Sequence, residues 1–197
     1  MPARIDAEQR RRDVVDAAFR LLVAEGFAGL SLRKVAVEAG LNIGSVRHYF
    51  EDHRDLLVAA ATEVGDRMGA RLERHPTAAL RGLTGAAAAD ALRALVEELL
   101  PVDEARRTES IVLLEFILAA RVNPLFAPVT ERMAADLRLV LTEALRVLGV
   151  AEPAERAEQL AAVIGGLAID AVTPHGSLSV ERMRTTLRAH LDSVLSA

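Results

Sequence analysis

The sequence contains no cysteine among its 197 residues. This absence excludes disulfide frameworks, zinc sites built on thiolates and cysteine nucleophiles, and it is compatible with a reducing cell interior. Long apolar runs are missing too, since no stretch approaches the roughly 20 uncharged apolar residues of a membrane span. The N-terminal segment MPARIDAEQRRR has no apolar run behind its charges, unlike a secretory signal. We therefore expect a cytoplasmic protein with no membrane partner.

The sequence also lacks the short motifs of enzyme active sites. It has no Glu-x-x-His pair, which a carboxylate metal site in a helical bundle needs. It has no Gly-x-Ser-x-Gly motif and no phosphate-binding loop. We therefore expect no catalytic residues, no metal and no cofactor, and an enzyme is the weaker alternative among the function classes.

Basic residues are not in excess, because the formal net charge is −4 at pH 7. Residues 1–56 contain nine basic and nine acidic residues, so this segment is neutral. Nucleic-acid binding must then depend on where individual cations lie. The candidate phosphate contacts in this segment, each of which also suits a solvated helix face, are Arg4, Arg10, Arg11, Arg12, Arg33 and Lys34.

Apolar residues recur at helical spacing through most of the chain, and no segment alternates apolar and polar residues over the length of a strand. The predicted fold class is all-α, with about nine helices. Gly26 stands where a first helix over residues 7–25 ends, and Ser31, Asn42 and Asp52 can cap the next three helices. Residues 1–56 are predicted to form a three-helix domain of the helix-turn-helix type, and residues 57–197 a larger helical bundle. Further helices are expected near 86–100, 103–122, 125–148, 154–173 and 179–195.

The segment GSVRHYF, residues 44–50, has two faces when it is wound into a helix. Val46 and Phe50 share one face, with Ile43 beside them, and we expect them to pack on the first two helices. Tyr49 lies at the border, and the other face carries Gly44, Ser45, Arg47 and His48. These are the proportions of a recognition helix, which enters the DNA major groove. Arginine can donate two hydrogen bonds to guanine, and glycine allows a close backbone approach.

An ordered set of motifs over residues 11–57 resembles the N-terminal DNA-binding domain of the TetR family of transcriptional regulators. The set comprises AA and L in the first helix, EGF at its end, S at the start of the second helix, VAVEAGLN across the turn, GSV and HYF in the third helix, and LL in the fourth. The resemblance implies DNA contacts at Ser31, Arg33, Asn42, Ser45, Arg47, His48 and Tyr49. Gly44 is a further candidate contact, because glycine allows the backbone to come close to DNA.

Two positions depart from the family pattern. Arg47 stands where many members have tyrosine, so we expect a different base or phosphate to be contacted there. His53 stands at the start of the fourth helix, where the family usually has lysine, and Arg54 follows it. A phosphate contact from His53 would depend on pH, because histidine titrates near neutral pH.

The region from residue 100 to the C-terminus is similar to the ligand-binding domain of the BetI-like branch of this family. The resemblance implies a small-molecule effector and a homodimer that forms through the last two helices. Gly165 and Gly166 permit close helix contact there. An apolar stripe in the last helix either pairs with a second subunit or belongs to the core of one chain: Val180, Met183, Leu187, Leu191 and Leu195.

The candidate effector contacts are Glu115, Phe116 and Asp170. Glu115 also suits a surface or ion-pair position, and Asp170 also suits a helix edge or a dimer interface. Past residue 75 the only aromatic residues are Phe116 and Phe126. Because a quaternary ammonium such as choline is usually held by an aromatic cage, an aliphatic or mixed-polarity effector fits better.

Together these features predict a ligand-responsive regulator of the TetR type. We expect a repressor that binds a palindromic double-stranded DNA operator as a dimer and is released by its effector. An activator of the same fold and a helical interaction scaffold without DNA binding are the alternatives. The resemblance also implies that the fourth helix transmits effector binding by changing the separation of the two recognition helices.

Overall fold

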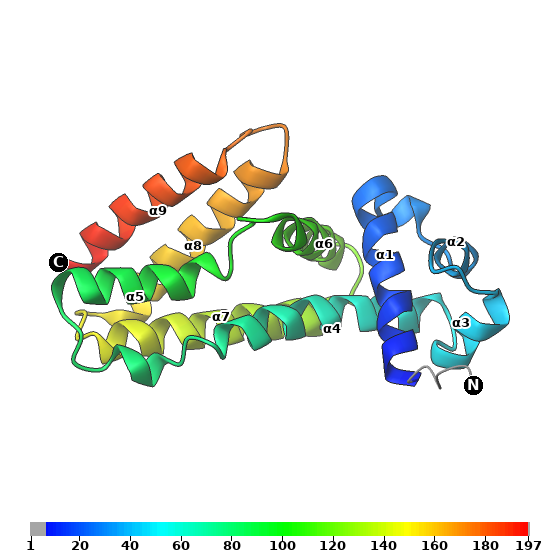
Figure 1. Cartoon of the computed structure of the whole chain (residues 1–197), viewed down its shortest axis with the longest axis horizontal. Helices are drawn as coiled ribbons and strands as arrows, with labels where there is room; N and C mark the ends of the chain where they lie inside the picture. The colour runs from blue at the N-terminus through cyan, green and yellow to red at the C-terminus, as the bar shows by residue number, and fades with distance from the viewer. Residues whose placement is uncertain (1–6, 197) are drawn as a thin grey trace, which may run out of the picture. The chain divides into compact units, whose positions relative to one another are not determined.

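The computed structural model describes residues 7–196. Every regular element in this part of the chain is a helix, which confirms the predicted all-α class (Figure 1). The elements follow one another as α1 (Ala7–Gly29), α2 (Leu32–Glu38), α3 (Ile43–Tyr49), α4 (His53–Leu72), the 3-10 helix η1 (Thr77–Leu80), α5 (Gly85–Glu97), α6 (Glu104–Ala120), α7 (Ala127–Val147), α8 (Pro153–Val172) and α9 (Val180–Leu195). Within the described range, none of these helices has the length and apolar character that crossing a bilayer requires.

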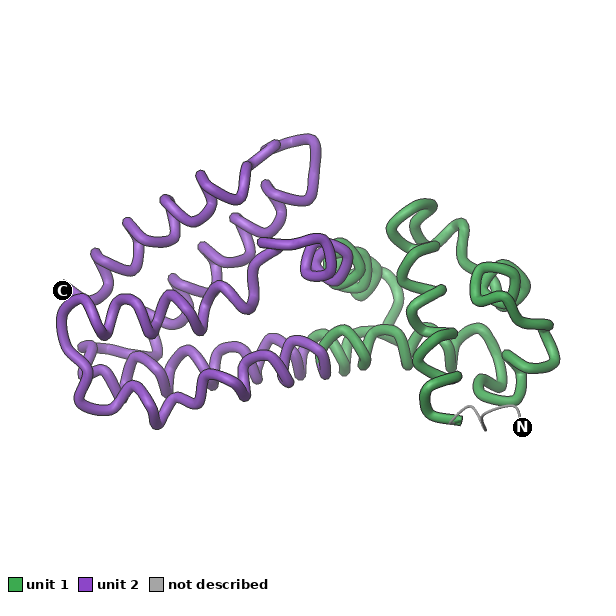
Figure 2. Tube along the Cα trace, in the orientation of Figure 1, with its two compact units in different colours: residues 1–65, 111–130 green, residues 66–110, 131–197 purple. Residues whose placement is uncertain are grey.

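The helices group into two compact units, which Figure 2 colours separately. Unit 1 comprises residues 1–65 and 111–130, and unit 2 comprises residues 66–110 and 131–197. Helices α4, α6 and α7 each begin in one unit and end in the other. The predicted DNA-binding domain, residues 1–56, and the predicted effector domain, residues 57–197, are defined by function and not by compactness. This division stays a prediction.

The short helices of unit 1 begin at the predicted caps. Each cap side chain accepts a hydrogen bond from a backbone N–H three residues later: Ser31 from Lys34 at 3.2 Å, Asn42 from Ser45 at 2.8 Å and Asp52 from Asp55 at 2.9 Å. These bonds satisfy backbone donors that have no partner inside the helix. Local polar residues thus set where α2, α3 and α4 start.

Helix α1 is broken near its end, as the sequence predicted. Gly26 has a φ of 62° and a ψ of −166°, a conformation outside the helical region that glycine adopts without strain. The chain then makes one more turn to Gly29. This turn carries Phe27, whose ring centroid lies 5.2 Å from that of Phe116 and 5.6 Å from that of Phe126. The three rings form the aromatic cluster of unit 1.

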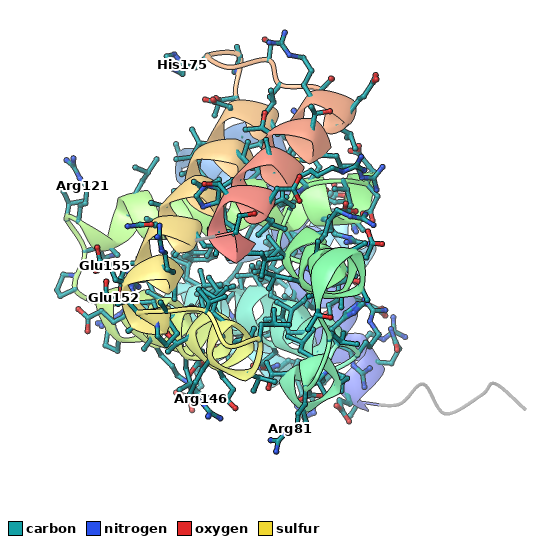
Figure 3. All side chains as sticks on the ribbon, turned by 90° about the vertical axis from the view of Figure 1, so that its left-hand side faces the viewer. Arg81, Arg121, Arg146, Glu152, Glu155 and His175 are labelled. Atoms are coloured by element: carbon teal, nitrogen blue, oxygen red, sulfur yellow. The ribbon has the colours of Figure 1, made fainter. Side chains whose placement is uncertain are left out.

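Unit 2 is an aliphatic bundle in which α9 packs against α5 and α8 (Figure 1). The last helix places Met183, Leu187 and Leu191 in this core, where each is at most 1% exposed. Val180 and Leu195 pack partly buried against it. The stripe of α9 therefore belongs to the core of its own chain, and the expectation that it pairs with a second subunit is wrong. Charged side chains at the end of this unit, such as Arg146 and Glu155, point away from the bundle (Figure 3).

Candidate DNA-binding surface

Helix α3 has the two faces that the sequence predicted, with one correction. Val46 and Phe50 are 0% and 1% exposed, so they anchor the helix in unit 1. Ile43 is 36% exposed, and the expectation that it packs beside them is wrong. Ile43 is the first residue of α3 and lies at the edge of the buried face. A short apolar contact of two side chains, Val46 and Phe50, therefore fixes how α3 presents its other face.

The outer face of α3 carries Arg47 and His48, both exposed, while Tyr49 is partly buried. The rings of His48 and Tyr49 stand nearly perpendicular, at 75°, with centroids 5.2 Å apart. Such an edge-to-face contact orders both side chains at the end of α3. Arg47 makes no ion pair with any described residue, so its guanidinium is available to acceptors outside the protein.

The start of α3 is ordered by Asn42. Its Oδ1 accepts hydrogen bonds from both the backbone N–H and the hydroxyl of Ser45, the latter at 3.2 Å. A Cβ at Gly44 would come within 3.2 Å of the same oxygen, so the glycine leaves room for this cap. The amide NH₂ of Asn42 keeps its two donors for other partners. Asn42, Gly44 and Ser45 are thus brought together, with donors left over at the exposed start of the helix.

Three cations among the described residues of this unit form ion pairs, and one of them is Arg12, whose Nη2 lies 3.1 Å from Glu8 Oε1. Lys34 Nζ lies 2.6 Å from Glu25 Oε2, and Arg20 Nε lies 2.6 Å from Glu38 Oε1. Arg33, beside Lys34 at the start of α2, is exposed and has no ion pair within residues 7–196. Residues 1–56 carry no net charge, but their cations differ in how free they are to contact DNA phosphates.

The remaining predicted contacts have varied surroundings. Ser31 is exposed as the cap of α2, and the guanidinium of Arg11 lies 5.1 Å from the ring centroid of Phe50. His53 is the first residue of α4 and is partly buried. Its Nδ1 atom is buried and has no hydrogen-bond partner among the described residues. Arg4 lies outside the described residues.

The candidate effector contacts fall into different units. Glu115 and Phe116 belong to unit 1, whereas Asp170 belongs to unit 2. Phe116 is 0% exposed and touches the rings of Phe27 and Phe126, which is the packing of a core residue. The Glu115 carboxylate lies near the backbone of Gly26. Asp170 lies on α8 against Gly176, where an added Cβ would overlap its side chain.

Sequence reasoning missed a cluster of charged residues inside unit 2. Glu98, whose side chain is 12% exposed, forms ion pairs with Arg71, Arg74 and Arg106, and its Oε1 lies 3.2 Å from Nε2 of His75. Glu109 on α6 is 6% exposed, and its Oε2 lies 2.5 Å from Arg71 Nη1. The guanidinium of Arg107 on α6 donates to the carbonyl oxygens of Ala171 and Val172 at the end of α8. The signal available in the sequence was Glu109, which directly precedes the apolar run SIVLL.

These features are those of a helix-turn-helix protein with a separate helical body, and the comparison with protein families defines the class. The family model described as bacterial regulatory proteins of the tetR family matches residues 14–60. The model described as the C-terminal region of BetI-type transcriptional repressors matches residues 88–196, which is more than half of the chain. The chain therefore belongs to the TetR family of transcriptional regulators, which are DNA-binding proteins and not enzymes.

Individual relatives agree with this assignment along the whole chain. The transcriptional regulator PksA of Bacillus subtilis (strain 168) is 28% identical over 98% of this chain and 94% of its own length. A transcriptional regulator from Rhodococcus sp. Rha1 superposes with a TM-score of 0.83 and 30% identity, covering 94% of this chain and 96% of that one. The multidrug-binding protein EbrR, solved with imidazole, has a TM-score of 0.62 and 30% identity, covering 92% of this chain and 94% of that one.

Proposed function

We propose that this protein is a ligand-responsive repressor that binds a palindromic operator as a dimer and leaves it when a small-molecule effector binds. The observation that carries the proposal is the outer face of α3. Its two cationic or titratable side chains, Arg47 and His48, are exposed, while Val46 and Phe50 hold the opposite face in the core of unit 1. A recognition helix needs this combination of a fixed backbone and free polar groups.

The proposed contacts divide into base readout and phosphate binding. Arg47 reads a base edge, since a guanidinium without an internal partner can donate two parallel hydrogen bonds to guanine. Arg33 and Ser31 at the start of α2 bind phosphates and fix the register. The free amide donors of Asn42 serve the same purpose at the start of α3. The remaining proposed contacts are Gly44, Ser45, His48, Tyr49 and His53.

Dimerisation through α8 and α9 is part of the proposal. The apolar stripe of α9 is used inside the chain, so the contact has to come from other faces of these helices. Gly165, Gly166 and Ala162 are exposed on α8, and Ile169 on the same helix is 42% exposed. Small residues permit close approach of a second helix, and a twofold operator requires a twofold protein.

Effector binding is proposed for the body of the chain, and α4 and α6 carry its effect. Helix α4 begins in unit 1 and ends in unit 2, whereas α6 begins in unit 2 and ends in unit 1. The effector can shift DNA affinity only if it binds one arrangement of the body better than another. From the relative EbrR we infer only one property for this chain, which is the capacity to bind a small organic molecule. The aromatic residues Phe116 and Phe126 are committed to the core cluster, which favours an aliphatic or mixed-polarity effector. The protein acts in the cytoplasm, because its proposed DNA target lies there.

The deciding experiment is fluorescence anisotropy with the full-length protein at moderate salt. Duplexes of operator length that tile the DNA flanking its own gene are compared with random duplexes of equal length. We expect at least one flanking duplex, containing an inverted repeat, to bind far more tightly than random DNA. If none does, the operator-binding function is wrong. A reporter behind that sequence then separates the modes, because deleting the regulator raises expression for a repressor and lowers it for an activator.

A further inference from the structure

The ion pair between Lys34 and Glu25 differs from an ordinary surface pair because the Glu25 side chain packs against the turn that closes α1. Glu25 stands at the end of the regular part of α1, just before the break at Gly26. Gly29 is buried against it, and a Cβ added at Gly29 would overlap the Glu25 side chain. The turn that closes α1 therefore packs directly on this glutamate. The Glu25 side chain is 43% exposed, and its carboxylate lies 2.6 Å from the Lys34 ammonium.

Lys34 lies directly beside Arg33 near the start of α2, on the segment proposed to bind phosphates. Arg33 has no ion pair within residues 7–196, whereas Lys34 is paired with the carboxylate of Glu25, which packs against the turn at Gly29. An exposed ion pair is weak, about 0–1 kcal/mol, so DNA could separate the two groups at little cost. The carboxylate would nevertheless remain beside the phosphate and repel it. The pair thus adds almost no net attraction to DNA, whether or not it stays closed.

We propose that Glu25 is a specificity-determining residue that withholds Lys34 from DNA phosphates and so restrains sequence-independent binding. The inference rests on the proposed DNA-binding face of α2 and α3. Non-specific binding comes almost entirely from phosphate contacts, and each one steepens the salt dependence of the affinity by about 0.9 in log–log slope. A repressor has to find its operator among a large excess of other sites, so a lower background raises its effective occupancy.

Another ion pair of unit 1, between Arg20 and Glu38, provides a matched control. Arg20 also donates from Nη2 to the backbone carbonyl of Glu38, at 3.3 Å, in addition to its side-chain pair. The guanidinium therefore stays at the end of α2 when the Glu38 carboxylate is removed. Glu38→Gln removes one negative charge from the same unit without releasing a cation at the start of α2.

The test measures binding of full-length protein to two duplexes over a range of salt concentrations. One duplex is an operator selected by the wild-type protein from a random pool, and the other is a random duplex of the same length. Glu25→Gln is compared with Glu38→Gln and with the double variant Glu25→Gln/Lys34→Gln. We expect Glu25→Gln to bind the random duplex several-fold more tightly at about 0.1 M salt, with a slope steeper by about 0.9.

The double variant is expected to return the slope to the wild-type value, because the released cation is then gone. The inference is overturned if Glu25→Gln leaves the random-duplex slope unchanged, if Glu38→Gln steepens it equally, or if the double variant stays steep. These outcomes differ from a failure of the proposed function, in which the wild-type protein itself selects no operator. Gain of binding also separates the effect from misfolding, which can only lose it.

Discussion

Units 1 and 2 are held together by different chemistry. All five phenylalanines and the single tyrosine belong to the segments of unit 1, and unit 2 has no aromatic residue. Unit 1 packs Phe27, Phe116 and Phe126 ring against ring and keeps its ion pairs at the surface. Unit 2 has an aliphatic core and instead encloses charged groups around Glu98 and Glu109.

The difference matches what each unit is proposed to do. A DNA-binding unit has to present a rigid face, and large apolar rings give much buried area for few residues. Its cations stay outside, where they can meet phosphates. In unit 2 the enclosed carboxylates connect α4, α5 and α6. Arg71 lies at the end of α4, Glu98 follows α5, and Glu109 lies in the second turn of α6. Buried ion pairs are sensitive to geometry, so this region has few acceptable arrangements.

The largest expected effect comes from removing a ring of the aromatic cluster. Phe116→Ala deletes a fully buried side chain that contacts two other rings, and such truncations typically cost about 3–5 kcal/mol. Urea denaturation of the full-length protein measures this loss. Hydrogen exchange is expected to rise first in residues 14–29 and 111–130. Phe116→Leu, which keeps most of the volume, is the control and should cost clearly less. Negligible losses for both variants would mean that the cluster does not stabilise unit 1, and equal large losses would mean that the ring contacts and not the buried volume set the cost.

The second expected effect tests the charged interior of unit 2. Glu109→Leu leaves the enclosed Arg71 with a longer ion pair to Glu98, at 3.7 Å, and a hydrogen bond to the Glu98 carbonyl oxygen, and should cost about 3 kcal/mol in urea denaturation. The double variant Arg71→Met/Glu109→Leu should recover most of that loss, because Glu98 keeps Arg74 and Arg106 as partners. A double variant less stable than the single one would show that Arg71 stabilises unit 2 independently of Glu109.

The sequence predicted those features of the fold that depend on residues only a few positions apart. The caps Ser31, Asn42 and Asp52 were predicted correctly, since each acts on a backbone N–H three residues away. The burial of Val46 and Phe50 followed from helical period alone. The predicted packing of Ile43 was wrong. The helical period shows on which side of the helix a residue lies, but it does not show how far along the helix the neighbouring helices reach.

Long-range partners could not be predicted in this way. Nothing local joins Phe27 to Phe116, and the pair between Lys34 and Glu25 needs the turn at Gly26 to bring its partners together. The stripe of α9 was expected to pair with a second subunit, and its packing against α5 and α8 shows that it lies in the core instead. The sequence therefore predicted which residues of the candidate site are exposed. It did not predict which of the cations are free of ion pairs.

The third prediction compares the free cations of unit 1 with each other. Arg47→Ala should cost about 1–3 kcal/mol in operator binding and relax the preference at one base pair, since a guanidinium contact to a base edge is lost. Arg33→Ala should weaken operator and random duplexes alike and lower the salt slope by about 0.9. Anisotropy titrations with operators mutated at each position measure both. A uniform loss across all sequences for Arg47→Ala would make it a phosphate contact as well.

The smallest expected effect concerns a histidine of unit 2. Burial, with a smaller contribution from the charge of Arg156, lowers the pKa of His190 below its usual value of 6.5. Protonation therefore favours the unfolded chain, in which the imidazole is solvated. Stability is fully present above pH 6.5 and declines as the pH falls through 6.5 toward the lowered pKa of the folded state. Thermal melts between pH 5 and 8 should show a flatter profile for His190→Gln than for the wild-type protein. His48→Gln removes an exposed imidazole from unit 1 as the control, and an equal flattening there would exclude burial of His190 as the cause.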